Sequence, residues 1–294
     1  MAPSCPNWLR IVLLCLTTAS FLPQLHRIRI QKTSTGLSLL YILLNLLGAT
    51  EQFTLAFFLT VNAGPEPDFF VHFPRSIGDW LNLAQLGVVW VMFLLLFILS
   101  LVYPAPYHPF SYRIIAATLY TAFALISIVP LFIDALFPTV FRDPDDRSLG
   151  FGVGLFAGGH FFIISLLVTL LSICSIIAQA TRLRSQLSSP SPGLGVVSFR
   201  DWALQGVVFA VLAVSWIFRA RIGSEEDVTW PFRSIFGYLR MGWAAGGSGI
   251  FAMVQAGLVV LGRGWSHEGV VLGESEPLLG EQRDEDVSGV NVCG

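Results

Sequence analysis

The chain reads FLPQLHRIRIQKTSTGLS from Phe21 to Ser38, where the end of an apolar run becomes basic and then turns into small polar residues. Pro23 has no backbone N–H and its ring crowds the preceding turn, so a helix here carries a kink and an unpaired carbonyl. The amide of Gln24 can satisfy backbone groups that are freed in this way. The pair therefore predicts a hinge near a helix end, and the alternative is a helix that simply stops at Pro23.

The sequence around this stretch is too apolar for a water-soluble protein. Of 294 residues, 54% are hydrophobic and only 12% are charged, which is too little charge to cover a soluble domain. A helix needs about 20 mostly apolar residues to cross about 30 Å of hydrocarbon. We therefore expect an all-α polytopic membrane protein with seven transmembrane helices. The matching runs lie near residues 8–25, 37–61, 77–102, 112–136, 151–177, 200–220 and 236–262.

Several classes of function lack support in this sequence. The formal net charge of −2 shows no basic excess for binding nucleic acid. The four cysteines form no CxxC pair and have no histidine cluster beside them, so no metal site is readable. We find no nucleophile–base motif and no phosphate-binding loop. The expectation is a protein without enzymatic activity or cofactor, whose surroundings are the lipid bilayer.

A second polar stretch, IAQATR at residues 177–182, also follows an apolar run and precedes a turn of small residues. Gln179 in this stretch corresponds to Gln24 in the first. Such a repeat predicts two parallel three-helix units joined by a single helix, a 3+1+3 arrangement that is one known way of building a transporter. The expected divisions are residues 1–110 for the first unit, 111–140 for the linker helix, 141–262 for the second unit and 263–294 for a disordered cytosolic tail.

The stretch from Leu22 to Ser38 resembles the signature of the PQ-loop family, which includes lysosomal cystine and cationic amino-acid exporters and is related to the SWEET sugar carriers. The matching residues are Pro23, Gln24, Lys32, Gly36 and Ser38, whereas the second copy has Ala178 in place of the proline before Gln179. The resemblance implies a carrier that moves a small metabolite across a vacuolar or lysosomal membrane by alternating access. The alternative is a PQ-loop protein that does not transport and acts as a regulator of lipid asymmetry or as a scaffold.

Ionisable and polar residues inside the predicted spans are candidates for the solute pathway, because a charge at membrane depth is costly unless it is paired or wetted. Glu51 could accept a coupling proton, or lie at the lumenal edge. His160 could relay a proton, or make an ordinary hydrogen bond between helices. Asn45 belongs to the same candidate set, and Arg240 is expected to reach the interface. Proton-coupled cystine exporters of the family carry an acid at the position of Leu40, and cationic amino-acid exporters carry one at the position of Ala49. Because both acids are missing here, uniport of a neutral solute also stays open.

The tail contains the pattern ESEPLL, in which Glu274 stands four residues before the leucine pair Leu278 and Leu279. Clathrin adaptors read such acidic dileucine signals to send cargo to lysosomes or vacuoles. The signal requires a cytosolic tail, and the weak excess of basic residues in the matching loops favours a lumenal N-terminus.

Overall fold

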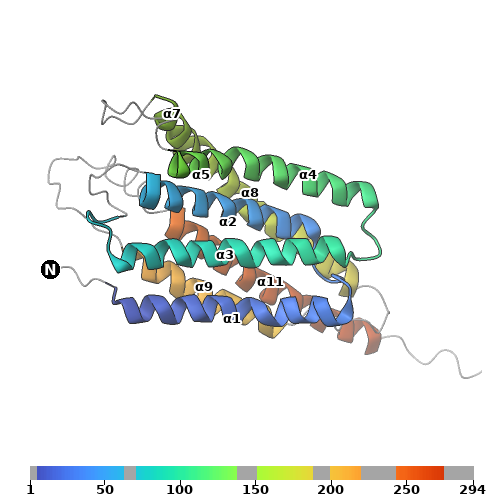
Figure 1. The fold of residues 1–294 in the computed structure, drawn as a ribbon. Helices are drawn as coiled ribbons and strands as arrows, with labels where there is room; N and C mark the ends of the chain where they lie inside the picture. Colours follow the sequence, from blue (N-terminus) through green and yellow to red (C-terminus); the bar gives the residue numbers. More distant parts are fainter. Residues whose placement is uncertain (1–4, 63–70, 138–150, 188–198, 220–242, 275–294) are drawn as a thin grey trace, which may run out of the picture.

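The computed structural model describes residues 5–62, 71–137, 151–187, 199–219 and 243–274. Every regular element among them is helical, and the long helices lie side by side along one common direction (Figure 1). The elements are α1 (Asn7–Gln31), α2 (Leu39–Phe57), the π-helical η1 (Phe58–Asn62), α3 (Ile77–Val102), α4 (Phe110–Ser127), α5 (Val129–Leu136), α7 (Phe151–Gly159), the π-helical η2 (His160–Ile164), α8 (Ser165–Leu187), α9 (Phe199–Ile217) and α11 (Trp243–Glu274).

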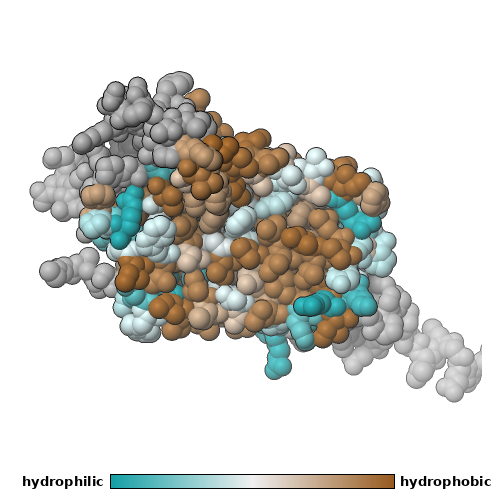
Figure 2. Space-filling view, viewed as in Figure 1, coloured by the Kyte–Doolittle hydropathy of each residue, from teal (hydrophilic) through white to brown (hydrophobic). Residues whose placement is uncertain are grey.

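Seven helical stretches of the described residues are long and apolar enough to cross a bilayer, which confirms the predicted count. Figure 2 shows apolar residues over the middle of the visible face and hydrophilic residues toward its two ends. This distribution suits a hydrocarbon layer between two polar interfaces. The chain is therefore a multi-pass integral membrane protein, surrounded by the lipid bilayer.

Several helices run further than their apolar stretches predicted. α1 continues to Gln31 and α8 to Leu187, so residues 21–27 and 177–182 lie inside helices and are not connectors. α11 continues to Glu274, so a tail that begins at residue 263 was wrong. The reason is that backbone hydrogen bonds propagate a helix beyond the membrane without an apolar stripe. Residues 275–294 lie outside the described part.

The predicted fourth helix is divided into α4 and α5. Val129 and Pro130 begin α5 just after Ile128, and the proline has no N–H to bond to the preceding turn. The whole stretch from Phe110 to Leu136 still counts as one membrane span.

The helices pack in two similar sets. α1 and α2 each contact α3, while α8 and α9 each contact α11. The sets meet where α1 packs on α9 and where α2 packs on α8, and α4 lies outside, against α2 (Figure 1). Two three-helix repeats with a linker helix would pack in this way, and the repeat itself stays a prediction.

Aromatic rings fill the centre of the contact between the sets. Phe93 of α3 packs edge-on against Phe21 of α1 and against Phe251 of α11, with ring centroids 5.0 and 5.3 Å apart. Phe209 of α9 contacts both Phe21 and Phe251. Three of these rings, Phe93, Phe209 and Phe251, also line the cavity that is described next.

Candidate functional site

A small cavity lies between α2, α3, α8, α9 and α11. The space open to the centres of water molecules is about 40 Å³, enough for about three waters when one needs about 10–15 Å³. The cavity is therefore too small for an amino acid in this conformation. Its polar lining residues are Asn45, Glu51, Gln52, Ser165, Thr169, Ser172 and Ser248, and its apolar floor includes Phe93, Phe209 and Phe251.

Glu51 on α2 and His160 at the start of η2 form a buried pair beside this cavity. His160 Nδ1 lies 2.8 Å from Glu51 Oε2 and 3.0 Å from Oε1, and the two residues are 1% and 2% exposed. The hydrogen bond satisfies polar groups that would be costly alone at membrane depth. His160 thus makes the hydrogen bond between helices that was its alternative, and Glu51 lies inside the span Leu39–Asn62, while its depth in the bilayer stays a prediction.

The backbone around this pair departs from regular α-helix. His160 begins the π-helical segment η2 inside a continuous helical stretch from Phe151 to Leu187. π-helical turns of this kind occur frequently at functional sites, because the extra residue turns a side chain toward a new direction. The wider turn here presents the imidazole to α2.

Asn45 lies one to two turns before Glu51 on α2 and also faces the second set of helices. Its Nδ2 donates to Ser175 Oγ at 3.1 Å and to the Tyr41 carbonyl at 2.8 Å. Asn45 is buried and lines the cavity, so it joins Glu51 in one wall, as two predicted pathway residues.

Pro23 lies inside α1, eight residues before the last residue of that helix, so the alternative that the helix ends there is wrong. Gln24 is buried and its Nε2 donates to Gln205 Oε1 of α9 at 3.4 Å. Gln205 Nε2 in turn donates to the Ser20 carbonyl at 3.2 Å. A second amide, from the facing helix, thus binds the backbone next to the turn that the proline disturbs.

Gln179 on α8 is fully buried and binds the loop that follows α1. Its Oε1 accepts from the Ser38 N–H at 2.8 Å, and its Nε2 donates to the Gly36 carbonyl at 2.7 Å. Gly36 has φ 104°, a conformation that only glycine adopts readily. Lys32 lies exposed at the start of this loop. The structure therefore brings Gln179, Gly36 and Ser38 together and leaves Lys32 in contact with solvent.

Some residues in these contacts were missed in the sequence. Gln205 is a polar residue within an apolar helix, as Asn45 is, and this pattern could have identified it in the sequence. Arg10 and Arg219 are both buried and donate to Asn82 Oδ1 at 3.3 and 3.4 Å. Burial lowers the pKa of Arg219, which follows α9, to about 10.

The structure does not place the remaining predicted residues at the cavity. Arg240, Leu278 and Leu279 lie outside the described residues, and Glu274 is the last residue of α11. Asp134, away from the cavity, is buried and its carboxylate accepts from Asn62 Nδ2 at 2.6 Å. Within the described ranges, no three His, Cys, Asp or Glu side chains are grouped to hold a metal ion.

Comparison with known proteins gives one match. The family model of the PQ loop repeat matches residues 6–63, which comprise α1, the loop bound by Gln179, α2 and η1. Neither the curated proteins nor the solved structures contain a significant match to the chain.

Proposed function

We propose that this multi-pass membrane protein, whose residues 6–63 match the family model of the PQ loop repeat, belongs to the PQ-loop family and is a carrier that moves a small metabolite by alternating access. The family includes membrane transporters and related membrane proteins. The observation that supports a carrier here is the polar cavity between the two sets of helices, with Glu51 in its wall and His160 bound to Glu51. A polar cavity at the seam of two helix sets is where such carriers bind their solutes.

One end of the seam between the helix sets carries contacts that suit alternating access. At the end that carries the loop 32–38, Gln179 holds the loop closed and Gln24 joins α1 to α9 through Gln205. Release of these amides would let α1 swing about Pro23 and open the cavity at that end. The hinge role of Pro23, Gln24 and Gln179 is part of the proposal.

The Glu51–His160 pair offers a place for a coupling proton. Gain or loss of one proton by the pair changes the net charge beside the cavity, and such a charge is costly until solvent or a solute compensates it. A proton exchanged when the cavity opens to water would therefore travel on one cycle with the solute.

We place the carrier in a vacuolar or lysosomal membrane. The support is the acidic dileucine pattern of Glu274, Leu278 and Leu279, which would engage a clathrin adaptor from the cytosolic side. Deletion of residues 275–294 tests this part of the proposal separately from transport. Unchanged delivery of the truncated chain to the organelle would contradict it.

The decisive experiment is uptake by vesicles that contain the purified full chain. A panel of amino acids and sugars is offered with and without a pH gradient, alongside the variants Gln24→Ala and Glu51→Gln. Saturable uptake that is lost in Gln24→Ala supports a carrier with a hinge at Pro23 and Gln24, and a response to pH that is lost in Glu51→Gln supports coupling. Absence of uptake for every solute would contradict the carrier and favour the scaffold or regulator. That alternative is supported by Leu40 and Ala49, which stand where transporting relatives carry acids.

A further inference from the structure

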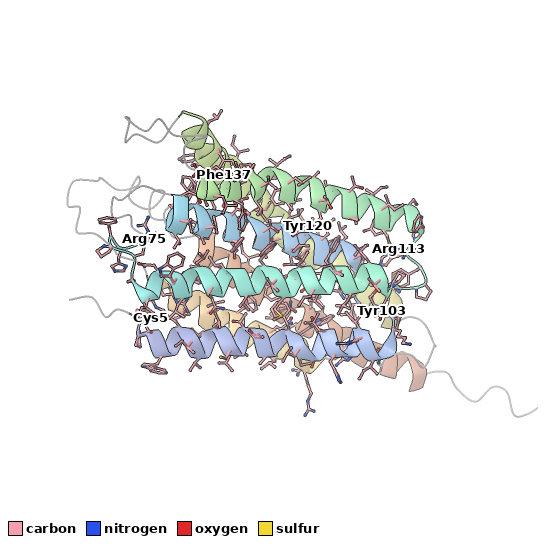
Figure 3. The ribbon with its side chains drawn as sticks, in the orientation of Figure 1. Cys5, Arg75, Tyr103, Arg113, Tyr120 and Phe137 are labelled. Carbon is pink, nitrogen blue, oxygen red and sulfur yellow. The ribbon has the colours of Figure 1, made fainter. Side chains whose placement is uncertain are left out.

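Basic and aromatic side chains converge outside the cavity, at the end of the bundle that carries the loop 32–38. The guanidinium carbon of Arg182 on α8 lies 3.2 Å from the centre of the Tyr107 ring, in the connection between α3 and α4. The His108 ring follows at 4.5 Å from Tyr107 and stacks with Tyr112 at 5.4 Å. Arg113 on α4 completes the group, and Figure 3 shows it near Tyr103 at the end opposite to Cys5 and Arg75. We call Arg113, Arg182 and His108 the basic cluster.

The positive charge of the basic cluster has no acidic partner among the described residues. Arg113 Nη1 donates to the Leu101 carbonyl and Arg182 Nη1 to Ser185 Oγ, and both acceptors are neutral. Arg27, at the same end of the bundle, is bound instead to Asp201 at 2.6 Å. Arg113 and Arg182 therefore both act on His108 without a carboxylate partner among the described residues.

Nitrogen atoms of all three side chains also lack hydrogen-bond acceptors. Arg113 Nε, Arg182 Nε and His108 Nε2 are buried and make no hydrogen bond, and a buried donor without an acceptor costs about 1–3 kcal/mol. Burial, together with the charges of Arg182 and Arg113, lowers the pKa of His108. The side chains are only partly buried, so a ligand can reach them from the surface.

The place of the basic cluster indicates the class of ligand. Exposed Phe110 and Tyr107 stand beside it, as aromatic residues do at the headgroup layer. Arginine matches the oxygens of phosphate with its planar fork, and basic pockets between transmembrane helices bind anionic headgroups. We propose that Arg113, Arg182 and His108 form a binding site for a phosphate group at the membrane surface, carried by a lipid headgroup or free in solution.

Occupation of this site would also act on the loop 32–38. The Tyr107 hydroxyl donates to the Leu37 carbonyl at 3.4 Å, and Arg182 lies one turn beyond Gln179, which binds Gly36 and Ser38. A phosphate bound by Arg113 and Arg182 would tie α4 to α8 over this loop. The site does not depend on the proposed carrier, because binding is measured without flux.

The test is equilibrium binding to the purified full chain in neutral detergent, measured by native mass spectrometry. The probes are short-chain phosphatidic acid, the matching diacylglycerol without phosphate, and inorganic phosphate. The variants are Arg113→Gln, Arg182→Gln and Arg182→Lys, and the control is Arg29→Gln, which removes one exposed charge from the same end of the bundle. Circular dichroism and elution volume establish that each variant is folded.

We expect phosphatidic acid to bind and diacylglycerol not to bind. Arg113→Gln and Arg182→Gln should each weaken binding about tenfold, because a charge-assisted hydrogen bond is lost, while Arg182→Lys and Arg29→Gln retain most of it. Equal binding of inorganic phosphate, with the same losses, would assign the site to the free ion. The proposal would be overturned if neither phosphatidic acid nor inorganic phosphate bound, or if Arg29→Gln weakened binding as much as Arg113→Gln and Arg182→Gln.

Discussion

Gln179 of α8 and Ser38 at the start of α2 are joined by a hydrogen bond of 2.8 Å, although 141 residues separate them in the sequence. The same amide also binds the Gly36 carbonyl. One side chain of the second helix set therefore satisfies two backbone groups of the first. This contact links the loop of the PQ-loop repeat directly to the second helix set.

Replacement of Gln179 by leucine should open this link. The Ser38 N–H and the Gly36 carbonyl would be buried without partners, each at a cost of about 1–3 kcal/mol. We expect a lower thermal unfolding temperature of the purified protein and loss of coupled flux. Gln31→Leu is the control, since Gln31 is exposed at the end of α1. Equal unfolding temperatures for the two variants would show that Gln179 does not hold the loop.

A single mutation in the Glu51–His160 pair should destabilise the protein more than replacement of both residues. His160→Ala leaves the Glu51 carboxylate buried without its partner, which costs roughly 3–5 kcal/mol. The double variant Glu51→Gln, His160→Gln removes the charge as well and should recover most of that stability. Thermal unfolding of the single and double variants checks this order. For comparison, Arg27→Gln breaks a more exposed pair and should cost less. A double variant as unstable as His160→Ala would argue against a charged pair.

Gly247 on α11 is the position where the cavity wall has least room. A Cβ atom added there would collide with the side-chain amide of Gln52 on α2. We expect Gly247→Ala to push the flexible Gln52 amide aside, at a net stability cost of no more than about 1 kcal/mol after the gain in helix propensity, and to reduce solute uptake, because Gln52 lines the cavity. The matched control is Gly158→Ala in α7, where no atom lies within 4 Å of the added carbon. That variant should be neutral or gain about 1 kcal/mol from helix propensity, and equal losses in both would refute the steric explanation.

The stability of the protein should fall in mild acid partly because of His108. Its pKa is lower in the folded protein than in the unfolded chain, through burial and the charges of Arg182 and Arg113. The unfolded state therefore binds more protons, and stability is lost as the pH falls through the unfolded pKa of about 6.5 toward the lower folded value. The groups that face His108 are Arg182, Arg113, Tyr107 and Tyr112.

The measurement for this prediction is the thermal unfolding temperature of wild type and His108→Gln between pH 8 and pH 5. The wild type should lose more stability than the variant over this range, in the absence of added phosphate. Parallel curves of unfolding temperature against pH for the two proteins would show that Arg182 and Arg113 do not lower the pKa of His108. The comparison cancels the contributions of other titrating groups, because both proteins share them.

The seven spans, and two members of the site, were predictable from residue type alone. Apolar runs must cross hydrocarbon, and Glu51 and His160 were conspicuous as ionisable residues within them. Their pairing was not predictable, because no local pattern states which helices pack together. The lengths of α1 and α8 were missed for a related reason, since a helix that leaves the bilayer continues on backbone hydrogen bonds without a change in hydropathy. Gln179 was recognised as a motif residue, but its contact with Gly36 and Ser38 depends on packing between distant helices.

Part of the seam between the helix sets is joined by side-chain amides, and this gives that part a mechanical property. Gln24, Gln205 and Gln179 make neutral hydrogen bonds across it, whose net worth against water is only about 0.5–1.5 kcal/mol each. When water enters, every amide exchanges one partner for another of similar strength. These contacts can therefore part and form again at little cost, whereas the Arg27–Asp201 ion pair between α1 and α9 resists separation more strongly.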